Sequence, residues 1–223
     1  MSSRAGFAVL ALGLMMGACS DGGAGGEAPI ASDSGAATPI DAVEELVGAI
    51  NEPDFTDASR LAVPEHAALA ALAEGATFAE VAESLREGDR EVAANFWAGF
   101  AQGTGSFLIG SVDVAGSGTV AEGSLEFHNV SVTPSSGDSR ALLVRDVDGY
   151  RVDLFASFGA GLADKMTAPV ERLLTTQTAD SRLILTRLQE IVPSLLAAAR
   201  LPGTPGDVSQ QLLALVEVIT RVG

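Results

Sequence analysis

The chain has 223 residues, with 29 acidic against 13 basic ones, so its formal net charge is −16 at pH 7. A protein that neutralises nucleic-acid phosphates needs a basic face, so this balance argues against nucleic-acid binding and against a polybasic membrane patch. The single cysteine excludes an intramolecular disulfide. The simplest interpretation of the excess of acidic residues is that it keeps a surface protein soluble, without a specific function.

The N-terminal residues have the order of a secretion signal. Arg4 supplies a positive start, and residues 7–16 (FAVLALGLMM) form an uncharged apolar run. This run is shorter than the ~20 residues that a membrane-spanning helix needs. The small residues Gly17 and Ala18 then precede Cys19, which is the pattern of a cleavage site.

The tetrapeptide Met16-Gly17-Ala18-Cys19 resembles the lipobox of bacterial lipoproteins, with Met where Leu is usual. The resemblance implies that residues 1–18 are a removed signal peptide and that Cys19 carries lipid on its sulfur, with a further acyl chain such as palmitate on its amine. Because this is the sole cysteine, lipid on its sulfur would leave no thiolate metal site. Several acyl chains anchor a protein stably. We therefore expect a membrane-anchored envelope protein with an extracytoplasmic domain. The alternatives are an incidental cysteine beside an ordinary cleavage site and an uncleaved anchor.

Composition divides the remainder of the chain. Residues 19–38 are rich in Gly, Ala and Ser and lack apolar periodicity, so they predict a flexible tether. Residues 39–223 suit one domain, or one domain with an appendage. We expect an α+β domain over 39–158 and a helical extension over 159–223 that packs on the same domain.

The first part of this domain has helical signals. Thr38 is a good N-cap with Pro39 after it, and Ile40, Val43, Leu46, Val47 and Ile50 share one helical face. A second helix is expected over about 64–74. A third should begin at residue 77, because residues 77–80 have capping-box spacing. A fourth should follow a break at Gly88-Asp89 and run to about residue 102.

Strand signals replace helical ones after Gly103. Expected strands cover residues 106–114, 119–132, 139–147 and 150–157, with a Gly-Ser-Gly turn at 116–118. The apolar parity shifts between Phe127 and Val130, which predicts a β-bulge near His128 and Asn129. Asp148-Gly149 is the strongest hairpin signal. We expect a curved antiparallel sheet of about four strands, cone-like, with the N-terminal helices packed on it.

Two apolar stripes predict helices after residue 158. One runs through Ile184, Leu188, Ile191, Val192 and Leu195, with Pro193 at a kink or boundary, and the other runs from Val208 to Val222. These stripes could pack on the domain's own core, cap the sheet or present a groove to a partner.

Two passages resemble the nuclear transport factor two-like family. Residues 42–62 (AVEELVGAINEPDFTDASRLA) look like its opening helix and the start of its second helix, and residues 142–155 (LLVRDVDGYRVDLF) look like its late hairpin. The resemblance implies a cone-shaped α+β domain whose sheet wraps around helices, and it covers about residues 39–158. The family hosts enzymes, binding modules and accessory domains, so the fold by itself assigns no function.

Enzymes of that family often place His, Asp or Tyr inside the cone. His128 is the candidate base here, with Asp113 and Tyr150 as candidate neighbours. The alternative is a strand histidine that faces solvent or makes a core hydrogen bond. His66 and Glu65 are adjacent and do not share a helical face, so they do not predict a metal site. We expect no metal and no cofactor.

The aromatic residues allow two interpretations. Trp97, Phe100, Phe107 and Phe127 could line an apolar pocket, although the helical spacing of Phe96, Trp97 and Phe100 is typical of plain core. With no catalytic constellation in the sequence, we expect a non-enzymatic lipoprotein that binds an apolar ligand or an envelope protein. The alternatives are a cone-type enzyme of the isomerase or dehydratase kind that uses His128, and a purely structural accessory domain.

Overall fold

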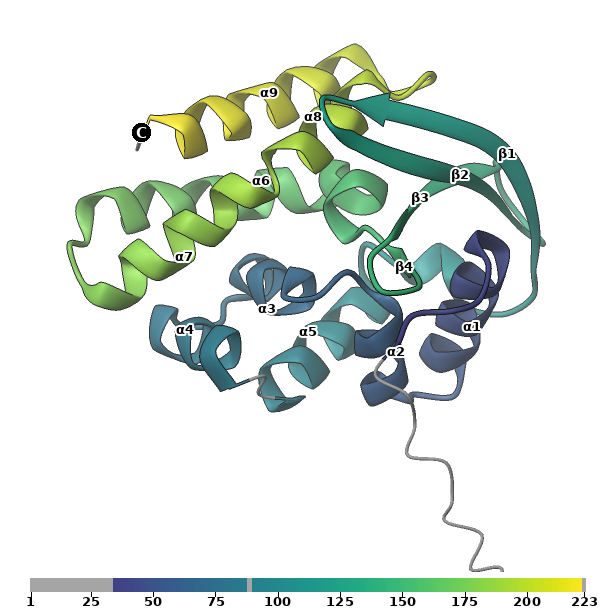
Figure 1. The fold of residues 1–223 in the computed structure, drawn as a ribbon, viewed down its shortest axis with the longest axis horizontal. Coiled ribbons are helices and arrows are strands. Elements are labelled where there is room, and N and C mark those ends of the chain that lie inside the picture. The colour runs from purple at the N-terminus through teal and green to yellow at the C-terminus, as the bar shows by residue number, and fades with distance from the viewer. Residues whose placement is uncertain (1–33, 88–89, 222–223) are drawn as a thin grey trace, which may run out of the picture. The chain divides into compact units, whose positions relative to one another are not determined.

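The computed structural model describes residues 34–87 and 90–221, shown as coloured ribbon in Figure 1. The predicted signal peptide, Cys19 and the tether up to residue 33 lie outside these residues, as does the predicted break at Gly88-Asp89. The helices before the sheet are α1 (Pro39–Asn51), α2 (Phe55–Leu61), α3 (His66–Ala70), the 3-10 helix η1 (Ala71–Glu74), α4 (Phe78–Glu87), α5 (Arg90–Gln102) and the 3-10 helix η2 (Ser106–Leu108).

The fold class is α+β, as predicted. The strands β1 (Val112–Glu122), β2 (Leu125–Pro134), β3 (Arg140–Asp146) and β4 (Tyr150–Val152) form one antiparallel sheet in the order β1-β2-β3-β4. Four helices follow the sheet: α6 (Leu154–Thr175), α7 (Ala179–Glu190), α8 (Val192–Arg200) and α9 (Gly206–Thr220).

Side-chain caps begin the helices where the sequence has capping residues. The Thr38 hydroxyl accepts a hydrogen bond from the Asp41 amide at 3.1 Å, which confirms the predicted start of α1. The Thr77 hydroxyl caps α4 in the same way. Local sequence signals did not predict helix α2, because its seven residues have too short an apolar stripe, although the resemblance over residues 42–62 implied the start of a second helix there. Its start is capped by Asp54, whose carboxylate accepts from the Asp57 amide at 3.0 Å.

The first hairpin differs from the prediction. Residues 106–108 form η2, and β1 begins only at Val112. The chain turns after Glu122, at Gly123 (φ +59°), and the predicted turn at 116–118 lies within β1. There Gly116 pairs with Val130 and Gly118 pairs with Asn129, which leaves Ser117 as the extra residue of a β-bulge. The glycines therefore bend an edge strand and do not end it.

Buried apolar residues change from one face of β2 to the other between Phe127 and Val130, but β2 itself does not have the predicted bulge there. The pairing of β2 with β3 is regular from His128 to Val132, so the extra residue at the expected place belongs to β1. Phe127 points to the face opposite Val130 and is buried in a second cluster with Leu143 and Ala197 of α8. Both faces of the sheet are therefore covered by helices near this point.

The predicted strand over 150–157 is wrong after Val152. Asp153 is the N-cap of α6, and its Oδ1 accepts a hydrogen bond from the Ala156 amide at 2.9 Å. The apolar run after it is therefore helical, and the expected boundary at residue 158 falls inside α6. The hairpin before it is confirmed, since Asp148 (φ +52°) and Gly149 (φ +93°) both have the left-handed conformation of a tight turn.

Helix α6 lies at the centre of the helical layer (Figure 1). It contacts α3, η1, α7, α8 and α9, and its Ser157 hydroxyl accepts a hydrogen bond from the Leu143 amide of β3. In this layer the buried residues of the predicted C-terminal stripes are Ile184, Leu188, Ile191, Leu195, Leu212, Leu215 and Ile219. Val222 lies outside the described residues. The first stripe divides into α7 and α8 at Ile191, next to Pro193. Among the residues described, no helix is both long and apolar enough to cross a bilayer.

Candidate functional site

A buried polar cluster lies where α3, the β3–β4 hairpin and α6 meet. Asp153 is fully buried, and His66 is 5% exposed. The His66 Nδ1 atom lies 3.5 Å from Asp153 Oδ1. The edge of the His66 ring contacts Phe155, with 5.0 Å between the ring centroids. The cluster therefore pairs an imidazole with a carboxylate in a site largely shielded from water.

Three further groups hold Asp153 in place. Besides the Ala156 amide, the Ser194 hydroxyl of α8 donates to Oδ2 at 2.7 Å, and Arg145 Nη1 of β3 donates to the same oxygen at 3.3 Å. A buried carboxylate needs such compensation, because its desolvation is costly. Asp153 therefore joins β3, α6 and α8 at one point, next to His66.

The environment of His66 favours the neutral form of its imidazole. Burial lowers the pKa of its imidazole, the Asp153 charge acts in the opposite direction, and the Arg145 charge lowers the pKa further. A neutral imidazole has one donor and one acceptor nitrogen. Nδ1 is buried and, within residues 34–87 and 90–221, forms no hydrogen bond. His66 therefore keeps unused hydrogen-bonding capacity beside a fixed negative charge.

His66 opens onto a pocket of about 300 Å³, which we call the His66 pocket. Its walls come from the segment before α3, from the end of β3 and from the end of α7. The lining residues are Val63, Pro64, Glu65, His66, Leu69, Arg145, Val147, Arg187, Glu190 and Ile191. Charged side chains of both signs thus surround one imidazole, which favours a polar ligand over an apolar one.

Glu65 forms the strained edge of this pocket. Its φ of +68° is a left-handed conformation, which is unfavourable for a residue with a side chain. Its carboxylate lies 3.3 Å from Arg187 Nε, and Arg187 also pairs with Glu190 at 3.0 Å. Burial raises the pKa of Glu65, against the effect of the Arg187 charge. In this conformation the Glu65 carboxylate contacts Arg187 of α7, and the next residue, His66, lies beside Asp153.

The residues predicted as catalytic do not all meet. His128 and Tyr150 lie on the same face of the sheet, with ring centroids 5.2 Å apart in an edge-to-face contact. Asp113 is exposed on the opposite face and pairs with Thr133, five residues along β2 from His128. At about 3.3 Å per residue this separation is roughly 16 Å. The structure therefore brings His128 to Tyr150 and not to Asp113.

The predicted aromatic pocket residues belong to packed core. Trp97 and Phe100 are at most 1% exposed and contact each other edge to face, and Phe100 contacts Phe158 in the same way. The Trp97 indole donates to the Ser59 hydroxyl at 2.9 Å. Phe127 is buried in the second cluster, and Phe107 is half-buried against the main one. The four residues therefore do not line one common space.

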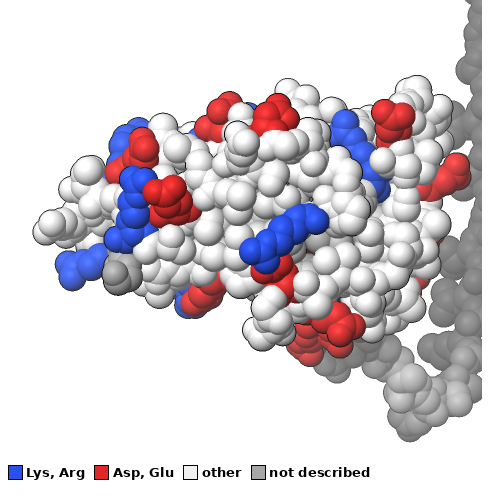
Figure 2. All heavy atoms as spheres, turned by 90° about the horizontal axis from the view of Figure 1, so that it is seen from above, with Lys and Arg blue, Asp and Glu red and all other residues white. Residues whose placement is uncertain are grey.

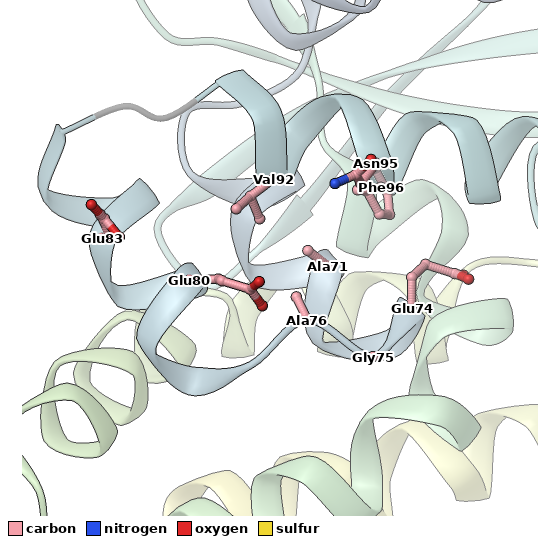
Figure 3. Close-up of a pocket in the computed structure, with 9 residues that line it drawn as sticks. All are labelled: Ala71, Glu74, Gly75, Ala76, Glu80, Glu83, Val92, Asn95 and Phe96. Atoms are coloured by element: carbon pink, nitrogen blue, oxygen red, sulfur yellow. The ribbon is translucent and has the colours of Figure 1, made fainter.

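A larger hollow of about 450 Å³ lies between η1, α4 and α5 (Figure 3). Glu74, Glu80 and Glu83 stand around it, but two of them are already engaged. The Glu80 carboxylate accepts from the Thr77 amide at 2.8 Å, and Glu74 pairs with Lys165 at 2.8 Å. In the part of the chain that the structure describes, no group of three His, Cys, Asp or Glu side chains has the arrangement of a metal site.

Sequence reasoning missed the His66–Asp153 pair, since no local motif joins residues so far apart. The available signal was Asp153 itself, an acidic residue directly before an apolar run that turns out to be a helix.

Comparisons of this chain with family models, with curated proteins and with solved structures found no match.

Proposed function

We propose that this protein is a lipid-anchored protein of the cell envelope whose domain binds a small polar ligand, without catalysis, in the His66 pocket. The anchor rests on the sequence order of Arg4, the apolar run 7–16 and the lipobox-like tetrapeptide that ends at Cys19. The ligand site rests on one observation, the buried His66 Nδ1, which lies 3.5 Å from Asp153 Oδ1 and forms no hydrogen bond within the residues that the structure describes.

A polar ligand is better supported than the apolar ligand expected from the sequence. Trp97 and Phe100 pack against each other in the main core, and Phe127 is buried in the second cluster. The His66 pocket, in contrast, has four charged residues and an imidazole among its apolar lining residues. On the face drawn in Figure 2, acidic and basic side chains are dispersed among uncharged ones, so this face presents no continuous patch of one sign to a protein partner.

Fractionation tests the anchor. Cys19→Ala removes the thiol that would carry lipid, so the variant should leave the membrane fraction, while the neighbouring Ser20→Ala variant should stay in it. Membrane association of Cys19→Ala equal to that of the unchanged protein would contradict the anchor.

Native mass spectrometry of protein gently extracted from its own membrane tests the ligand site. We expect an added small-molecule mass that His66→Gln loses and His128→Gln keeps, with circular dichroism showing that both variants are folded. A mass of the polypeptide and its lipid alone, in every preparation, would refute the binding function.

A second candidate function is proton abstraction, as in an isomerase or dehydratase, because the Asp153 charge lies where it would stabilise a protonated His66. The co-purified ligand, incubated in D₂O, distinguishes the two functions. Deuterium incorporation that requires His66 indicates catalysis, and its absence indicates binding alone.

A further inference from the structure

We propose that a second pocket, beside Arg140, binds a phosphate group. This Arg140 pocket has a volume of about 310 Å³ and lies between η2, the start of β3 and α6. Its lining residues are Gly103, Thr104, Ser106, Phe107, Arg140, Ala141, Ser157, Phe158, Ala160 and Gly161. It shares no lining residue with the His66 pocket, so it is an independent site.

Arg140 keeps its hydrogen-bonding groups free. Its guanidinium carbon lies over the Phe107 ring, 4.4 Å from the centroid, which is a cation–π contact. Within residues 34–87 and 90–221, the Arg140 side chain forms neither an ion pair nor a hydrogen bond. The planar guanidinium has five N–H donors, which are suited to two oxygens of an anion at once.

This freedom is unusual in so acidic a chain. Most other basic side chains that the structure describes form an ion pair: Arg60, Arg86, Arg145, Lys165, Arg187, Arg200 and Arg221. Arg172 and Arg182 each donate to a carbonyl of their own helix or its cap. Arg140 is instead stacked on Phe107, which orients it beside the pocket and leaves its charge unneutralised.

The pocket is also lined by residues that have neutral donors. The Thr104 and Ser106 hydroxyls line the pocket, and in the described part of the chain neither forms a hydrogen bond. Gly161 lets α6 approach this loop, because a Cβ there would lie 2.7 Å from Thr104 Cγ2. A guanidinium and two hydroxyls around one pocket supply charged and neutral donors from different directions, and the oxygens of a tetrahedral phosphate, unlike those of a planar carboxylate, also point in several directions.

The first test is a titration of the full-length Cys19→Ala protein with inorganic phosphate, followed by amide chemical shifts. We expect saturable shifts for residues 104–107 and 161, with a weaker response to acetate. Arg140→Gln should reduce the affinity about tenfold or more, as the loss of charged hydrogen bonds implies. Arg172→Gln, which removes another exposed charge elsewhere, should leave the affinity unchanged.

Thr104→Val provides a variant of nearly the same shape that lacks the hydroxyl, and it should weaken phosphate binding while the protein stays folded.

A second experiment adds vesicles of phosphatidylglycerol to the Cys19→Ala protein. Arg140-dependent binding to vesicles identifies a lipid headgroup as the source of the phosphate, and binding of free phosphate alone identifies a soluble ligand. Binding in neither experiment, or equal binding by Arg140→Gln, would overturn the proposal and would leave the His66 pocket untouched.

Discussion

The imidazole of His66 lies 3.5 Å from the carboxylate of Asp153, and Asp153 at the same time caps α6 and accepts hydrogen bonds from Arg145 and Ser194. One buried carboxylate therefore organises both the candidate site and the junction of three elements. The consequences for stability and for the site can be measured separately.

Replacing Asp153 should destabilise the fold strongly. Asp153→Ala removes a helix cap and leaves Arg145 and Ser194 without their buried acceptor, which should lower the free energy of unfolding by about 3–5 kcal/mol. Urea denaturation measures this change. The exposed Asp113→Ala variant is the control and should stay within ~0.5 kcal/mol of the unchanged protein.

The stability should depend on the protonation of His66. Burial lowers its pKa in the folded state below the ordinary 6.5, so the unfolded chain binds more protons between the two values. The free energy of unfolding should therefore fall as the pH decreases from 6.5 toward the folded pKa, and the contribution of His66 is fully present above 6.5.

The comparison with His66→Gln isolates this effect. Glu65, whose pKa is raised from 4.5 by burial, acts in the opposite direction at lower pH, and its contribution is present in both proteins. Denaturation at a series of pH values should show a shallower slope for His66→Gln just below pH 6.5. Identical slopes would mean that His66 is as accessible to protons as in the unfolded chain.

Two glycines should respond to alanine in opposite ways. Gly149 has φ +93°, and a Cβ there would lie 2.8 Å from the Gly35 amide nitrogen, so Gly149→Ala should cost about 1–3 kcal/mol. Gly48 lies within α1 with open space around it, so Gly48→Ala should stabilise by about 0.5–1 kcal/mol. Thermal unfolding of the two variants would reveal the opposite signs.

The aromatic group should behave as core. Phe100 is 1% exposed and packs against Trp97 and Phe158, so Phe100→Ala should lower the free energy of unfolding by about 3–5 kcal/mol. The half-buried Phe107 should cost less when truncated. A Phe100→Ala variant that is nearly as stable as the unchanged protein would instead support the apolar pocket considered from the sequence.

Features with a short-range cause were predictable. The cap at Thr38, the hairpin at Asp148-Gly149 and the helix boundary beside Pro193 each depend on the conformational preferences of a few neighbouring residues. Where two local interpretations competed, the prediction failed. The glycines at 116–118 suit a turn or a bulge, and the apolar residues after Val152 suit a strand or a helix.

The sequence by itself determined the acidic character, the sole cysteine at a lipobox-like signal, the α+β class and most helix starts, because each depends on composition or on residues within one helical turn. Only the tertiary structure decided that Phe127 faces α8, that Asp113 and His128 lie on opposite faces of the sheet, and that Asp153 meets His66. These relationships depend on strand register and helix packing, which join segments far apart in the chain and leave no local pattern.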